Sequence, residues 1–151
     1  MTSIEQVPLS LAKWPFIDSG DLNYPEHVDT IRSRQLKVLL IDDTDEFRES
    51  MTDLLTEKYG AAVTDVDSGS EAVALLKAGK EFNVIFLDLI MPGMNAVETY
   101  KALQQAGLSC RVIVMSAHPD SPVWQEAEEL GMELIEKPIE QAALITILSE
   151  L

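Results

Sequence analysis

The feature that most constrains this chain is a set of four short apolar runs, each ending in a polar residue. The runs close on Asp42 and Asp43, on Asp88, on Ser116 and near Lys137. Continuous apolar runs separated by amphipathic stretches predict buried parallel strands. In an open parallel sheet, ligands bind at the carboxyl ends of the strands. We therefore expect one crevice to hold acids, a hydroxyl and an ammonium, a set that suits a divalent cation and a phosphoryl group.

The residues that start and end helices between these runs predict five strands alternating with five helices. Capping residues such as Asn95 and Ser121 precede the helical stretches, and glycines such as Gly60 and Gly107 follow them. The expected strands are residues 36–41, 61–66, 83–88, 111–116 and 133–136, and the last helix covers 140–151. This order predicts an α/β fold, a doubly wound five-stranded parallel sheet with helices on both faces.

Charge and composition exclude several classes of function. The formal net charge is −15, and residues 36–151 carry 8 basic and 21 acidic residues. Such a surface repels a phosphate backbone, so no direct nucleic-acid binding is expected. The single cysteine, Cys110, excludes an intramolecular disulfide and a zinc cluster. No secretory signal or membrane-spanning stretch is recognisable, so we expect no membrane contact and a cytoplasmic location.

Residues 1–35 do not follow the strand–helix alternation and are expected to form an N-terminal leader to a domain at residues 36–151. They contain Trp14, Phe16 and three prolines without a clear period, and residues 30–35 allow a helical turn. The leader is either flexible or an arm that docks on its own domain or on a partner through Trp14, Pro15 and Phe16. Docking is favoured because aromatic residues are scarce in disordered segments.

With the strand ends placed, residues 36–151 resemble the receiver domain of two-component response regulators. The resemblance rests on Asp42-Asp43 after Val-Leu-Leu-Ile, on Asp88 in Asp-Leu-Ile-Met-Pro-Gly-Met-Asn, on Ser116-Ala117 and on Lys137-Pro138. It implies a flavodoxin-like sheet of order 2-1-3-4-5. It also implies that Asp88 accepts a phosphoryl group from a sensor histidine kinase or a phosphotransfer protein.

The metal ion implied by the resemblance is Mg²⁺, with Mn²⁺ as an alternative. Asp43 and Asp88 are expected as direct ligands, Asp42 through water, and the backbone carbonyl of Ile90 as a further ligand. Crowded carboxylates raise each other's proton affinity, and a divalent cation relieves the repulsion. Magnesium prefers oxygen ligands and keeps several waters, which suits an open crevice.

Lys137 and Ser116 complete the implied site. Lys137 is expected to neutralise charge during phosphoryl transfer, and Ser116 to donate its hydroxyl to a phosphoryl oxygen afterwards. The resemblance also implies a cis bond between Lys137 and Pro138. His118 has two interpretations, a plain surface residue or, with Ile90, a control on water access to the acyl phosphate.

Each site residue also has a purely structural interpretation. Asp42 and Asp43 are able to cap the following helix, and Lys137 is able to pair with Glu136 at the surface. Serines such as Ser116 end many strands. The combination of all these residues on neighbouring strand ends favours the site.

The predicted function is a stand-alone response regulator that binds an unknown target protein, since no output domain follows in this sequence. It is not a turnover enzyme, although Mg²⁺-dependent self-phosphorylation and slow self-dephosphorylation are expected. Receivers usually signal through the fourth helix, fifth strand and fifth helix, and a homodimer through this surface is a further expectation. Trp124 and an apolar-rich last helix with Leu144, Ile145, Ile147 and Leu148 lie there, an apolar surplus that suits a partner or a second copy.

The sequence departs from the usual receiver pattern at two positions, and two other functions compete with the predicted one. Leu134 stands where many receivers carry an aromatic residue, and Ala96 where many carry glycine. The first departure, with the long leader, supports an alternative: a pseudo-receiver that acts as a phosphorylation-independent binding or scaffold module. A Mg²⁺-dependent hydrolase would need a second acid near Asp88, and Ile90 two residues later argues against that chemistry.

Overall fold

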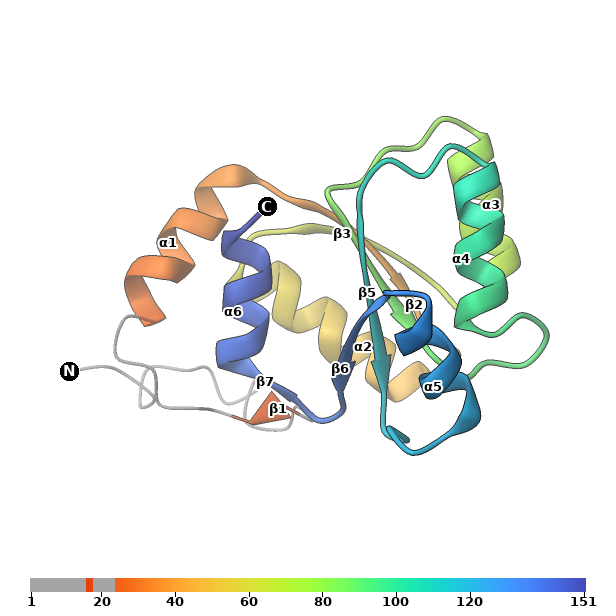
Figure 1. The fold of residues 1–151 in the computed structure, drawn as a ribbon. Coiled ribbons are helices and arrows are strands. Elements are labelled where there is room, and N and C mark those ends of the chain that lie inside the picture. Colours follow the sequence, from red (N-terminus) through yellow and green to blue (C-terminus); the bar gives the residue numbers. More distant parts are fainter. Residues whose placement is uncertain (1–15, 18–23) are drawn as a thin grey trace.

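The computed structural model describes residues 16–17 and 24–151 of the chain. Its main sheet has five parallel strands in the order β3-β2-β4-β5-β6 (Figure 1). Counted along the chain, these strands follow the order 2-1-3-4-5, so the predicted topology is confirmed. The strands are β2 Lys37–Ile41, β3 Ala62–Val66, β4 Val84–Asp88, β5 Arg111–Ser116 and β6 Glu133–Glu136.

The strand register brings the carboxyl ends of the central strands to the same edge of the sheet. Ile41 pairs with Leu87 in the neighbouring strand, and Asp88 pairs with Met115 in the next. Strand β4 is buried along its whole length. A strand buried on both faces needs a continuous apolar run, which explains why Asp88 is its only charged residue.

Four helices connect these five strands and a fifth follows the last one, largely where the capping residues predict them. The Asn95 side chain and Glu98 form a reciprocal capping box, and Ser121 Oγ accepts a hydrogen bond from Trp124 N–H ahead of Pro122. The first of the five continues without a break into a π-helix, η3, of Leu54–Lys58, which the sequence pattern does not reveal. The helices are α2 Asp45–Asp53, α3 Gly69–Lys77, α4 Ala96–Gln105, α5 Pro122–Glu129 and α6 Gln141–Ser149.

The helices form two layers, and each layer buries one face of the sheet. Alternate strand residues such as Leu40 and Phe86 pack with α2, η3 and α6 in one cluster. The other alternation, which includes Leu39 and Ile85, packs with α3, α4 and α5. Figure 1 shows these two layers on opposite sides of the strands. Among the described residues, no helix is both long enough and apolar enough to cross a bilayer.

The N-terminal segment adds a helix, α1 (Tyr24–Arg34), where the sequence allows only a turn at residues 30–35. Helix α1 lies beside α6 (Figure 1), and its Ile31 is fully buried in the same cluster as α6. The guanidinium of Arg32 donates to the carbonyl oxygens of Glu57 and Lys58 at 2.9 Å each. Helix α1 is therefore packed on the same layer as α2, η3 and α6.

A second contact joins the N-terminal segment to the rest of the chain. Strand β1 (Phe16–Ile17) pairs in parallel with β7 (Ile139–Glu140), so that Phe16 lies opposite Ile139. The backbone at Phe16 is thus docked on the chain itself. Trp14 and Pro15, the other residues of the expected docking arm, lie outside the described residues.

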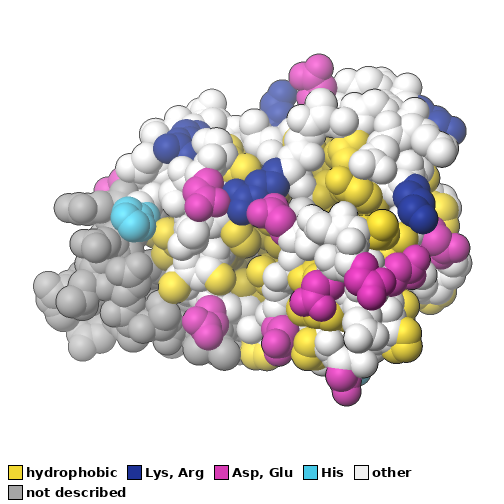
Figure 2. Space-filling model, in the orientation of Figure 1, with side chains coloured by type: hydrophobic (Ala, Val, Ile, Leu, Met, Phe, Trp, Pro, Cys, Tyr) yellow, Lys and Arg dark blue, Asp and Glu magenta, His cyan; other side chains and the backbone are white. Residues whose placement is uncertain are grey.

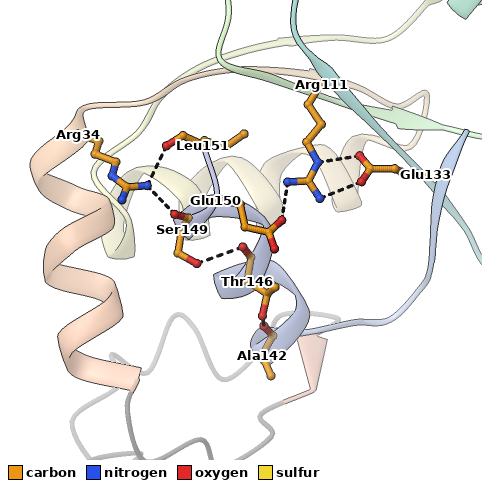
Figure 3. A network of polar contacts seen from close by, with 8 residues as sticks. All are labelled: Arg34, Arg111, Glu133, Ala142, Thr146, Ser149, Glu150 and Leu151. Atoms are coloured by element: carbon orange, nitrogen blue, oxygen red, sulfur yellow. Dashed lines mark hydrogen bonds and ion pairs between the residues drawn. The ribbon is translucent and has the colours of Figure 1, made fainter.

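Two arginines hold the end of α6 (Figure 3). The guanidinium of Arg34 donates to the carbonyl oxygens of Ser149, at 2.7 Å, and of Leu151, at 2.9 Å. Arg111 forms ion pairs with Glu133 and with Glu150, each at 2.7 Å. Cationic side chains at the C-terminal end of a helix satisfy its free carbonyls and oppose its negative pole.

The apolar surplus of the last helix has an explanation within the chain. Leu144, Ile145, Ile147 and Leu148 are all buried, in one cluster with Ile31 of α1. A helix that is apolar on most sides is a helix covered on most sides. The expectation that this surplus faces a partner or a second copy is corrected, because the sheet and α1 already cover it.

Candidate functional site

Three aspartates meet at the carboxyl edge of the sheet. Asp88 is the last residue of β4, and Asp42 and Asp43 directly follow β2. One carboxylate oxygen of each lies within 4.8 Å of the other two. Asp42 is fully buried, Asp88 is 8% exposed and Asp43 is exposed. The predicted grouping of these acids is therefore present, with two acids inside the crevice and one at its mouth.

Lys137 enters the same crevice from the segment that follows β6. Its ammonium lies 2.7 Å from Asp42 Oδ2 and 3.3 Å from Asp88 Oδ1. Its backbone N–H donates to the carbonyl oxygen of Ser116 at 2.8 Å, which fixes this segment beside the end of β5. The Lys137–Pro138 bond is cis, as the resemblance implies. Lys137 pairs with the buried acids and not with Glu136, so the surface interpretation of Lys137 does not hold.

The carboxylate of Asp42 is engaged on both oxygens. Oδ1 accepts a hydrogen bond from Thr44 N–H at 2.8 Å, and Oδ2 accepts from Lys137. The N-cap position of α2 is Thr44, whose side chain makes no capping hydrogen bond. Asp42 therefore orders the turn into α2 and anchors Lys137, which leaves Asp43 and Asp88 as the acids with more open oxygens.

The pKa of Asp88 is raised to about 7. Burial is the main cause, because it penalises the charged form, and the negative charges of Asp42 and Asp43 add to it. The ammonium of Lys137 acts in the opposite direction. The raised pKa shows that the single ammonium of Lys137 does not balance the negative charge of the three carboxylates. A further cation would do so, and this all-oxygen donor set fits a hard divalent cation such as Mg²⁺.

Ser116 ends β5 next to the end of β4 and is almost fully buried. Its Oγ accepts a hydrogen bond from the backbone N–H of His118 at 2.9 Å. The hydroxyl is thus oriented by its own loop, on the strand adjacent to Asp88. The His118 side chain is exposed, which leaves both of its interpretations open.

The loop after β4 is also ordered by backbone hydrogen bonds. Leu89 N–H donates to Met115 O, and Ala96 N–H donates back to Leu89 O. Gly93 adopts a φ of +85°, a conformation that favours glycine. The turn therefore forms with alanine at position 96. Ile90 is 45% exposed at the start of this loop.

Phe47, the aromatic partner of the lysine, is not among the residues that the sequence predicts for the site. The ring of Phe47 is buried on α2, and the Lys137 ammonium lies 3.9 Å from its centroid. Such a contact stabilises the cation by about 0.5–2 kcal/mol. A signal was present, because Phe47 is the first apolar residue after Asp43 on the helix face that packs on the sheet.

A 2-1-3-4-5 parallel sheet with three acids and a lysine at its carboxyl edge defines a flavodoxin-like α/β domain with an acidic crevice. The chain belongs to the response regulator receiver domain family, whose family model matches residues 38–149. These are the phosphorylation-responsive domains of two-component systems, as the resemblance implied.

Relatives and solved structures agree with this membership. The chain is 42% identical over 113 residues to the transcriptional regulatory protein FixJ of Azorhizobium caulinodans, covering 73% of this chain and 52% of the relative. It is 32% identical to FixJ of Bradyrhizobium diazoefficiens, covering 74% and 54%. The chain thus spans about half the length of these curated relatives. Two solved structures have a similar fold. FixJ-N has a TM-score of 0.66 and 31% identity, covering 76% of this chain and 94% of that one. The Vibrio cholerae chemotaxis protein CheY4 has a TM-score of 0.64 and 26% identity, covering 77% of this chain and 98% of that one.

Proposed function

We propose that Asp88 is the phosphoacceptor of this receiver and that a histidine kinase or phosphotransfer protein is the donor. The observation that carries the proposal is the pairing of a nearly buried Asp88 with Lys137 at 3.3 Å, beside two further acids. In the reaction, an Asp88 oxygen forms a bond to phosphorus as the P–N bond to the donor histidine breaks. The released imidazole takes a proton from solvent.

We propose Mg²⁺ as the resident ion, with Mn²⁺ as a substitute. Asp43 and Asp88 would bind it directly, together with the backbone carbonyl of Ile90. Asp42 would act through water, which fits the finding that Thr44 N–H and Lys137 already engage both of its oxygens. When bound, the ion neutralises the acids and polarises the phosphoryl oxygens.

The remaining steps fall to Lys137 and Ser116. Lys137 is positioned to neutralise charge that develops on the phosphoryl oxygens, as a compact cation with its ring partner Phe47 behind it. Ser116 would donate its hydroxyl to a phosphoryl oxygen after transfer, with its loop moving toward the new charge. His118 on this loop and Ile90 on the loop after β4 are exposed, and they would set how readily water reaches the acyl phosphate.

The output of the switch would be a change in protein–protein contacts. The expected surface corresponds to α5, β6 and α6, where Trp124 and Leu134 are partly buried. A target protein or a second copy would bind there. That the receiver works without an attached output domain stays a prediction, which the intact mass of the protein isolated from its own cells tests.

The first experiment is intact mass spectrometry after incubation with acetyl phosphate. With Mg²⁺, the wild type should gain one phosphoryl group, and with EDTA it should gain none. Asp88→Asn should gain none in either buffer, and Glu81→Gln, at an exposed acid ahead of β4 and so at the opposite edge of the sheet, should behave like the wild type. A gain that persists in Asp88→Asn would contradict the assignment of the acceptor.

The alternative is a pseudo-receiver that binds partners without phosphorylation. Leu134, in place of an aromatic residue, favours it because the usual aromatic switch is missing. A pull-down with and without beryllofluoride, a mimic of the phosphoryl group, separates the two functions. Equal capture in both states supports the scaffold, and state-dependent capture supports the switch.

A further inference from the structure

The main sheet has an open edge at β6. In the described part of the chain, β6 is hydrogen-bonded to β5 alone, so its other side presents free backbone groups. A groove of about 570 Å³ runs along this edge, lined by Trp124, by residues 134–140 and by Ala143. On the face seen in Figure 2, apolar side chains are exposed between acidic ones. A strand edge inside an apolar groove is a docking site for an extended segment.

The N-terminal segment already reaches one end of this groove. Phe16 pairs with Ile139 and Ile17 with Glu140, and both of these β7 residues line the groove. The pairing is parallel. Its continuation before Phe16 would bring the preceding residues alongside Lys137 and β6, at the open edge.

Continuing the register backward gives specific partners. In that continuation Trp14 would fall opposite Lys137, Lys13 opposite Glu136 and Leu11 opposite Leu134. Lys13 is the only lysine or arginine in the sequence of residues 1–15, and this register would set it opposite an acidic residue. Cross-strand pairs of opposite charge stabilise a sheet by about 0.2–1 kcal/mol.

The same register would also be compatible with the break between β6 and β7. Pro15 would fall opposite Pro138, so the two residues that lack an N–H would face each other at that break. Residues 11–15 extend over about 16 Å, enough to cover the four residues of β6.

We propose that residues 11–15 of this chain add a sixth parallel strand to the β6 edge and fill the groove between α5 and α6. The segment suits the groove, because Leu11 would lie on the face of Leu134 and Trp124, and Trp14 on the opposite face, toward Ala143 of α6. This interaction does not depend on phosphoryl transfer, and it would cover part of the surface proposed above for the output, so that a target would meet residues 11–15 there. The open edge is thereby closed within one molecule.

Hydrogen–deuterium exchange of the peptide covering residues 133–136 tests the proposal. Ala12→Pro removes an N–H from the centre of the segment and blocks the ladder, whereas Ser3→Pro lies outside the proposed strand. The β6 amides should exchange about tenfold faster or more in Ala12→Pro and at the wild-type rate in Ser3→Pro. Unchanged exchange of β4 peptides controls for folding. Equal β6 exchange in all three proteins would overturn the proposal.

A charge exchange tests the register itself. Lys13→Glu and Glu136→Lys should each speed exchange at β6, and the double variant should restore protection. Lys80→Glu, at a remote exposed lysine, is the matched control. Protection that survives Ala12→Pro and grows with protein concentration would identify a second copy as the occupant and overturn the proposal. Asp88→Asn should keep wild-type protection, so failure of the phosphoacceptor assignment is distinguishable from failure here.

Discussion

The ammonium of Lys137 lies closer to Asp42 than to Asp88, at 2.7 Å against 3.3 Å. Asp42 is the more deeply buried of the two acids, and its other oxygen is held by Thr44 N–H. Lys137 is therefore anchored on Asp42 and reaches over Asp88. This division of contacts holds the lysine in place while leaving Asp88 available for chemistry.

Replacing Lys137 should damage both folding and phosphorylation. Lys137→Met leaves the buried Asp42 without its cation, and breaking a buried pair in this way costs about 3 kcal/mol. We expect a loss of this order in the unfolding free energy, measured by urea denaturation, and about a 100-fold slower phosphoryl gain from acetyl phosphate. Lys101→Met, at an exposed lysine of α4, should leave both quantities unchanged. Phosphorylation of Lys137→Met at the wild-type rate would show that the lysine takes no part in phosphoryl transfer.

The stability of the metal-free protein should fall as pH rises. Asp88 has a pKa of about 7 in the folded state and an ordinary, lower one when unfolded. Between about pH 4 and pH 7 the folded state holds a proton that the unfolded state has lost. The free energy of unfolding therefore falls as pH rises from about 4 to about 7, and above pH 7 Asp88 causes no further change.

Urea denaturation in EDTA from pH 5 to pH 8 checks this dependence. Asp88→Asn cannot titrate, so at pH 8 it should be more stable than the wild type by on the order of 2–4 kcal/mol. Glu81→Gln, ahead of β4 at the opposite edge of the sheet, should follow the wild-type curve. A wild-type curve parallel to that of Asp88→Asn would show that the raised pKa is wrong.

The contact between α3 and α4 should not tolerate a side chain at Gly69. A Cβ at this position would clash with the Oγ1 of the buried Thr99, and Gly69 itself is buried. Gly69→Ala should lower the unfolding free energy by about 1–3 kcal/mol through overpacking. Ser70→Ala, one residue further on an exposed face, should have little effect. Thr99→Ala should reduce the cost of Gly69→Ala, and additive effects in the double variant would contradict the clash.

Helix α1 should contribute to the stability of the whole receiver. Ile31 is fully buried against the cluster that includes α6, so Ile31→Ala removes buried surface and leaves a cavity. We expect a loss of about 2–4 kcal/mol in one cooperative unfolding transition. Val28→Ala, at a partly buried position on the same helix, should cost less. A separate early transition with the main one unchanged would show that α1 folds independently.

The strands and the acidic site could be predicted from the sequence because both follow from local patterns. Apolar runs identify β2 and β4, and the residue after each run must lie at the carboxyl edge. The sequence therefore predicts that Asp42 and Asp88 lie close together. Asn95 and Ser121 mark helix starts through their own hydrogen bonds. These features depend on neighbours in the chain.

The features that escaped prediction depend on contacts between distant residues. Helix α1 has few apolar residues, and only packing of Ile31 against α6 reveals its role. The same packing explains Leu144 and Ile147, whose apolar character suggested an external partner. The Lys137–Phe47 contact joins residues from separate elements, and no sequence spacing specifies it.

The grip of Arg34 on α6 uses only backbone oxygens, those of Ser149 and Leu151. No substitution on α6 deletes these acceptors, so the contact is indifferent to which side chains the last turn carries. The contact does depend on the helical conformation of that turn, because fraying would move both oxygens away from the guanidinium. The Arg34 contact therefore couples α1 to the order of the last turn, while the exposed side chains of that turn are free to vary without removing it.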